Sequence, residues 1–151
     1  ESRLVGRCAL PESLKERMAR SPLLILEQPM EERIGIIRED YVEGMYSDYV
    51  DRDGAEAGWL NFRDYLLSAI DRIRKRLGGE RHQQLRGLMD QALLQQEATG
   101  ETAAHNAWIQ SLLQDYYDPM YDYQLGKKEG RILVRGGPKT ILDWANKSSV
   151  A

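Results

Sequence analysis

The chain has 151 residues, enough for one domain with a true core, and its formal charge at pH 7 is −3. A general basic field is excluded, so any nucleic-acid surface must be a local patch. Cys8 is the only cysteine. It excludes an internal disulfide and a multi-cysteine metal site, and it fits a reducing, cytoplasmic compartment. The two histidines fall on different predicted helices, so we expect no metal site.

Membrane contact is not expected either. No apolar run approaches the roughly 20 residues of a membrane-spanning helix, and no signal peptide is visible. The chain opens on ESRLVG, with Glu1 in place of a methionine. This opening predicts a piece of a longer protein.

The first predicted elements are an extended segment ending at Val5 and a helix beginning at Pro11, PESLKERMARS. LLIL, residues 23–26, is a short apolar run between prolines, which is typical of a strand buried on both faces of a parallel sheet. A loop and a long helix follow. Helical spacing predicts the buried stripe of that helix as Ile34, Ile37, Tyr41, Met45 and Tyr49.

Arg33 and Arg38 lie near the start of this helix, off its apolar stripe. They suit a solvated, salt-bridged face. They also suit phosphate binding, because ligands gather beyond the carboxyl ends of strands in open α/β sheets. The residues leave both interpretations open.

Three more amphipathic helices fill the middle of the chain. The second predicted helix runs from Trp59 to Leu77, and the third ends near Gly100. The fourth covers residues 101–118, with Trp108, Leu112 and Tyr116 as its buried positions. His105 lies one turn before Trp108 and is predicted to be a histidine at the edge of the core rather than a base.

A positive cluster lies around the end of the second helix. Cations at a helix C-terminus need no special role, because the helix dipole favours them there. Their density in an acidic chain nevertheless makes this cluster the preferred site for a phosphate backbone. Its predicted RNA-binding members are Arg72, Arg74, Lys75, Arg76 and Arg81.

The chain is organised around YYDPMYDYQLGKK, residues 116–128. Asp118 and Pro119 predict a helix start, since aspartate caps free N–H groups and proline suits the first turn. The tyrosines suit half-buried positions in which the hydroxyl groups reach water. Alternatively, Tyr121 or Tyr123 beside Lys127 and Lys128 forms a surface for base stacking and phosphate contact, as used for single-stranded RNA.

The last predicted elements are a strand, RILVR at residues 131–135, and a final helix after GGP. The fold predicted is mainly α, a helical bundle joined to the C-terminal remnant, two short strands, of an α/β domain. Residues 1–42 and 129–151 are assigned to the α/β part and 43–128 to a helical insertion. Two strands are too few for a stable sheet.

The pattern resembles a known family. LPESLKERM, LLILEQPMEERIGIIREDYV, AIDRIRKRLGGERH and above all YYDPMYDYQLGKK look like the C-terminal part of bacterial tRNA 2-selenouridine synthases. The resemblance implies an upstream rhodanese-like domain and a P-loop domain. It also implies a transferase that replaces the sulfur of 2-thiouridine at the tRNA wobble position by selenium, through a geranylated intermediate. Selenophosphate and geranyl diphosphate are then its substrates.

The departures from that family bear on activity. The sequence contains no G-x-x-x-x-G-K-[ST], and Cys8 falls outside the part that resembles the rhodanese-like domain, so we expect no catalytic residue here and an inactive fragment. The resemblance places Ser2 and Arg3 near a phosphate or diphosphate site. It also implies binding of the tRNA anticodon arm by the helical part.

Two rival functions remain open at this stage. A nucleotide-type kinase would use Arg33 and Arg38 as phosphate clamps beneath a helical lid. A helical protein-interaction module would bind no small ligand.

Overall fold

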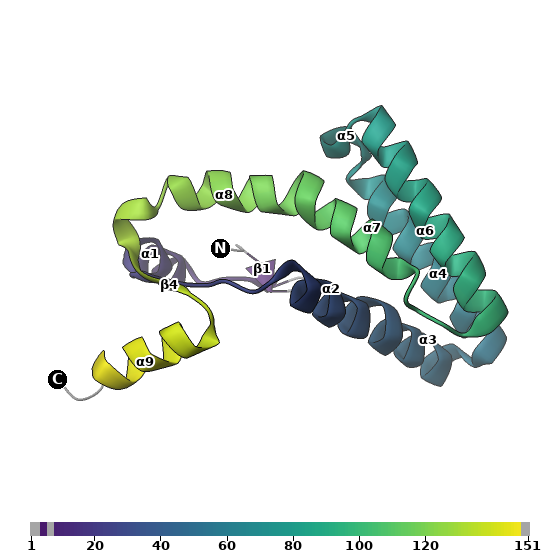
Figure 1. Cartoon of the computed structure of the whole chain (residues 1–151), viewed down its shortest axis with the longest axis horizontal. Helices are drawn as coiled ribbons and strands as arrows, with labels where there is room; N and C mark the ends of the chain where they lie inside the picture. Colours follow the sequence, from purple (N-terminus) through teal and green to yellow (C-terminus); the bar gives the residue numbers. More distant parts are fainter. Residues whose placement is uncertain (1–3, 6–7, 149–151) are drawn as a thin grey trace. The chain divides into compact units, whose positions relative to one another are not determined.

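The computed structural model describes residues 4–5 and 8–148, and it is mainly helical with little sheet (Figure 1). The chain forms two compact units. The helical unit is Pro29–Asp122, and the terminal unit combines Glu1–Gln28 with Tyr123–Ala151.

The terminal unit contains two small sheets. Strands β1 (Leu4–Val5) and β2 (Cys8–Ala9) pair antiparallel, and Cys8 is exposed. Strands β3 (Leu23–Leu26) and β4 (Ile132–Gly136) pair parallel, which confirms the two predicted strands and their direction. Helix α9 (Pro138–Ser148) contacts both strands of the parallel pair.

The prediction that LLIL is buried on both faces is wrong. Exposure alternates along β3, and Leu24 and Leu26 keep 42% and 53% of their surface exposed. Because side chains alternate between the two faces of a strand, this pattern means that one face of the pair is covered and the other is open.

Helix α1 (Glu12–Arg20) is held to the segment before β4, which contains the short 3₁₀ helix Glu129–Arg131. The Arg131 guanidinium donates to the carbonyl of Met18 at 2.6 Å and to the carbonyl of Ser21 at 2.9 Å. Carbonyls at a helix C-terminus lack intrahelical partners, so this contact satisfies them and places a cation where the dipole favours it.

The helical unit is built from antiparallel neighbours (Figure 1). Its elements are α2 (Met30–Arg38), a π-helical turn (Glu39–Gly44), α3 (Met45–Asp53), α4 (Ala55–Arg72), α5 (Arg74–Leu77), α6 (Gly79–Thr99), α7 (His105–Leu112), a second π-helical turn (Leu113–Tyr117) and the start of α8 (Asp118–Gly126). The boundary between the two units falls within α8.

The first π-helical turn changes which residue reaches the core. The regular helical spacing predicts Tyr41 as buried, but Tyr41 is 53% exposed and Val42 is completely buried. A π turn holds more than four residues, so the inward position advances by one. The predicted stripe is therefore correct at Ile34 and wrong at Tyr41.

A second π-helical turn lies just before Pro119. Leu113, its first residue, is buried at 5% exposure, whereas the predicted Leu112 is only partly buried against the core. Helix α8 begins at Asp118, as predicted, but it continues the π turn without a break, so the predicted role of Asp118 as a helix cap is wrong. Proline lacks an N–H and clashes with the carbonyl four residues earlier, and the wider turn avoids that conflict.

Close backbone contact joins α3 and α4. A β-carbon on Gly58 would lie 2.7 Å from the Tyr49 oxygen and the Val50 α-carbon, so only glycine allows this approach. The predicted long second helix ends at Arg72, and a short helix begins after Ile73. Gly78, at a φ of 84°, then turns the chain into α6.

A polar chain crosses the core of the helical unit. His105 is completely buried, deeper than the edge of the core where the sequence placed it. The Trp108 indole N–H donates to His105 Nδ1 at 2.8 Å, and His105 Nε2 lies 2.9 Å from Gln96 Oε1. Burial lowers the pKa of His105 to about 4, so the ring is neutral. The apolar core around it comprises Ile34, Val42, Phe62, Leu66, Ile70, Leu77, Leu85, Met89, Ala92, Leu93, Trp108, Ile109 and Leu113.

Candidate nucleic-acid interface

Charge is divided unevenly between the two units. The helical unit holds 10 lysines and arginines against 18 aspartates and glutamates, a formal charge of −8. The terminal unit holds 11 against 6, a formal charge of +5. A polyanion would therefore meet the helical unit favourably only at a local concentration of cations.

Five arginines of the helical unit are neutralised by neighbouring carboxylates. They pair within 4 Å with acidic side chains from the same or adjacent helices. These five are Arg33, Arg38, Arg52, Arg63 and Arg86.

The other five cations of this unit are the five predicted around the end of α4, and we call them the basic tip: Arg72, Arg74, Lys75, Arg76 and Arg81. All are exposed, and no carboxylate among the described residues forms an ion pair with any of them. Arg72 donates to the Ser68 hydroxyl at 3.4 Å. The break at Ile73 and the turn at Gly78 gather these side chains at one end of the helices.

The basic tip touches the tyrosine-rich stretch. Arg76 donates to the Tyr116 hydroxyl at 3.3 Å, across 40 residues of sequence. Tyr116 packs edge-on against Tyr117 with ring centroids 5.0 Å apart, and Tyr117 stacks on Tyr121 at 6.1 Å with an interplanar angle of 19°. A row of rings thus runs from the basic tip to Tyr121.

The rings of this row differ in exposure. Burial raises the pKa of Tyr117, which keeps its phenol neutral. Tyr121 is 51% exposed, and Tyr117 covers one of its faces. The remaining face can stack on a nucleobase. Helical spacing predicts Tyr116 as a core residue, so the sequence pattern does not reveal it as the link to Arg76.

In the terminal unit, Lys127 and Tyr123 form a cation–π pair. The Lys127 Nζ lies 4.0 Å from the centre of the Tyr123 ring, and Tyr123 is 67% exposed. Lys128, also predicted as an RNA contact, is half-buried. These residues belong to a different unit from the basic tip.

The predicted phosphate ligands have structural partners. Arg33 binds Asp118 in a bidentate ion pair, with Nη1–Oδ2 at 3.0 Å and Nη2–Oδ1 at 2.5 Å. Arg38 donates to Asn106 Oδ1 at 3.1 Å and pairs with Glu43 at 3.2 Å. Asp118, expected as a helix cap, instead joins α8 to α2 through this pair.

The remaining predicted phosphate contacts, Ser2 and Arg3, lie outside the described residues. Within residues 4–5 and 8–148, no group of three histidine, cysteine or acidic side chains is arranged to hold a metal ion. No helix in that part of the chain combines the length and the apolar character needed to cross a membrane.

Comparison with known proteins gives consistent matches. The family model described as "tRNA 2-selenouridine synthase AAA domain" matches residues 1–151. The tRNA 2-selenouridine synthase of Marinobacter nauticus is 73% identical over 145 residues, covering 96% of this chain and 40% of the relative. That of Shewanella oneidensis is 45% identical over 149 residues, covering 99% of this chain and 40% of the relative.

That of Aeromonas salmonicida is 46% identical over 144 residues, covering 95% of this chain and 39% of the relative. The chain thus spans about 40% of the length of the curated relatives that it matches. No solved structure matches it. The match over the whole chain and the identities with these curated relatives show that the chain belongs to the tRNA 2-selenouridine synthase family.

Proposed function

We propose that this chain is the tRNA-binding part of an enzyme that exchanges sulfur for selenium in 2-thiouridine at the wobble position. Family membership supports the tRNA modification. The family resemblance supplies the geranylated intermediate, with selenophosphate and geranyl diphosphate as substrates of the longer protein. We further propose that the parallel strands belong to a P-loop α/β domain and that the helical unit is an insertion in it.

The observation that carries the binding proposal is the contrast between paired and unpaired cations. Elsewhere in the acidic helical unit each arginine has a carboxylate partner, while the five cations of the basic tip have none among the described residues. Unpaired cations are free to replace the counterions of a phosphate backbone. We assign the basic tip to the backbone of the anticodon arm and Tyr121 to an unstacked base.

A salt titration of tRNA binding by the intact protein tests the basic tip. Arg74→Glu and Lys75→Glu together should lower affinity equally for thiolated and unmodified anticodon arms. The double variant should also flatten the log–log salt dependence by roughly one unit per lost phosphate contact. Arg63→Glu, which changes a half-buried arginine paired with Asp64 at 3.9 Å, is the control, and its effect is compared per unit of charge changed. Equal effects of the tip variant and the control would refute the assignment.

The stacking role of Tyr121 has a different signature. Tyr121→Ala should weaken binding by about 1–3 kcal/mol through lost stacking, with an unchanged salt slope. Tyr41→Ala is the control, because Tyr41 is similarly exposed at 53% and lies outside the row of rings. A change in slope, or the same loss from both variants, would contradict base stacking.

The chemistry is proposed to reside outside these 151 residues. The purified chain should neither geranylate nor selenate thiolated tRNA, because the sequence contains no phosphate-binding P-loop motif. Mass spectrometry of digested tRNA provides the measurement, and a geranylated or selenated nucleoside would overturn this assignment.

A further inference from the structure

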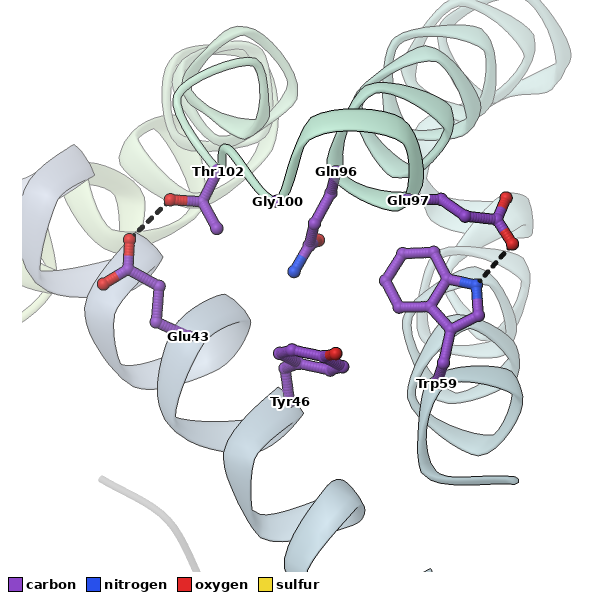
Figure 2. Close-up of a pocket in the computed structure, with 7 residues that line it drawn as sticks. All are labelled: Glu43, Tyr46, Trp59, Gln96, Glu97, Gly100 and Thr102. Carbon is purple, nitrogen blue, oxygen red and sulfur yellow. Dashed lines mark hydrogen bonds between the residues drawn. The ribbon is translucent and has the colours of Figure 1, made fainter. Parts of the chain in front are cut away.

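A second site lies at the other end of α6 from the basic tip. A pocket of about 510 Å³ opens between Glu43, Tyr46, Trp59, Gln96, Glu97, Gly100 and Thr102 (Figure 2). Arg81 and Gln96 are 15 residues apart on α6, which is about 22 Å along a helix axis. The pocket is therefore distinct from the proposed RNA contact, and sequence periodicity gives no sign of it.

The buried hydrogen-bond chain determines what Gln96 presents to this pocket. An indole N–H can only donate, so His105 Nδ1 must accept from Trp108, and the single proton of the neutral ring lies on Nε2. That proton is donated to Gln96, whose bonded atom must be its carbonyl oxygen. The amide NH₂ group of Gln96 therefore has to face away from the histidine.

Figure 2 shows this amide nitrogen pointing into the open space above the Tyr46 ring. Gln96 is only 5% exposed, and its NH₂ group has no partner among the described residues. This amide donor is accessible from the pocket and is not engaged by the protein, so it can donate to a ligand that carries an acceptor such as a carbonyl oxygen.

Acidic and aromatic groups form the rest of the pocket. Glu43 Oε1 accepts from Thr102 and pairs with Arg38, and Glu97 Oε1 accepts from the Trp59 indole at 2.9 Å. These contacts orient both carboxylates. The second oxygen of each, Oε2, has no partner among the described residues and can accept from a ligand.

The aromatic walls favour a cation. The Tyr46 and Trp59 rings meet edge to face, with centroids 5.8 Å apart. None of the lining residues is a lysine, arginine or histidine. Arg38 pairs with Glu43 from outside the lining, so Glu97 is the carboxylate without a cationic partner among the described residues, and the whole unit carries a formal charge of −8. Aromatic faces beside carboxylates bind ammonium and guanidinium groups, whereas a nucleotide would bring its phosphate into a negative field.

We propose that this pocket binds a basic residue of a polypeptide. The cationic side chain lies against the aromatic rings and the carboxylate rim, and the backbone carbonyl accepts from the Gln96 amide. Arginine fits best, because its planar guanidinium both stacks on rings and donates to carboxylates. This site is independent of the RNA-binding proposal.

Fluorine NMR of the intact protein labelled with 5-fluorotryptophan tests the proposal. Trp59→Phe assigns the Trp59 signal, and N-acetylarginine methylamide is the probe. We expect a saturable shift of that signal. N-acetylglycine methylamide, with the carbonyl but no cation, and guanidinium chloride, with the cation but no carbonyl, should each bind at least about tenfold more weakly because each loses one anchoring contact.

Matched variants separate the pocket from general acidity. Glu97→Gln keeps an acceptor for the indole and removes the charge. It should lower the affinity for the arginine probe by about five- to tenfold. Glu101→Gln removes the same charge from an exposed neighbour that does not line the pocket, and it should change nothing. Equal effects of the two variants, no saturable shift, or tighter binding of uridine than of the arginine probe would each overturn the proposal.

Discussion

The buried histidine makes the stability of the helical unit depend on pH. Because burial lowers the pKa of His105 from 6.5 to about 4, the folded state keeps the ring neutral while the unfolded chain binds a proton below pH 6.5. Stability is therefore fully present above the unfolded pKa, and it is lost as pH falls through 6.5 toward 4. Protonation would also place two N–H donors face to face between His105 and Trp108.

The size of this effect follows from the two pKa values. Between pH 7 and pH 5, the unfolded state gains nearly the full proton and the folded state gains little. The free energy of unfolding should fall by about 2 kcal/mol from this group alone. His105→Gln removes the titration, so its stability should fall by about 2 kcal/mol less than that of the wild type over the same range, whatever its absolute stability.

Urea unfolding followed by tryptophan fluorescence at pH 7 and pH 5 provides the measurement. His82→Gln is the control, because the other histidine is also buried, at 8% exposure, but bonds to the Asp71 carboxylate at 2.8 Å. Parallel losses for the wild type and His105→Gln would refute the argument, since they would show that His105 titrates alike in the folded and unfolded states.

Three further comparisons, with five substitutions, test the packing. Gly58→Ala should destabilise the chain by about 1–3 kcal/mol, because the new β-carbon would lie 2.7 Å from backbone atoms. Gly87→Ala is the control, since Gly87 faces open space on a helix, and it should stabilise the chain by up to about 1 kcal/mol. Equal shifts of the melting temperature would contradict the close contact at Gly58. Leu113→Ala should lower the free energy of unfolding by about 2–5 kcal/mol in urea, and Leu112→Ala should lower it clearly less, because Leu113 is buried and Leu112 only partly so. The reverse order would mean that Leu112 is the core side chain. Asp118→Asn should lower the free energy of unfolding by about 1 kcal/mol, because its ion pair with the α2 arginine is partly exposed. High salt should reduce the difference in stability between this variant and the wild type.

Much of the architecture follows from sequence patterns alone. The apolar runs at 23–26 and 132–134 predict the two strands, and amphipathic spacing predicts the helices between them, because burial of one face imposes a period on the sequence. The density of cations around Arg74 likewise marks the basic tip without any structure. Cys8 and the composition limit which functions are possible.

Tertiary structure decides what local periodicity cannot encode. The first π-helical turn replaces Tyr41 by Val42 in the core, since one extra residue in a turn moves every later side chain around the helix. Helical periodicity also does not predict the long-range ion pairs that neutralise Arg33 and Arg86, whose partners Asp118 and Asp71 come from other helices. The Gln96 amide NH₂ faces its pocket because the Trp108 indole can only donate, which leaves the proton of His105 on Nε2, bonded to the Gln96 oxygen. This orientation depends on three residues that come together only in the folded chain.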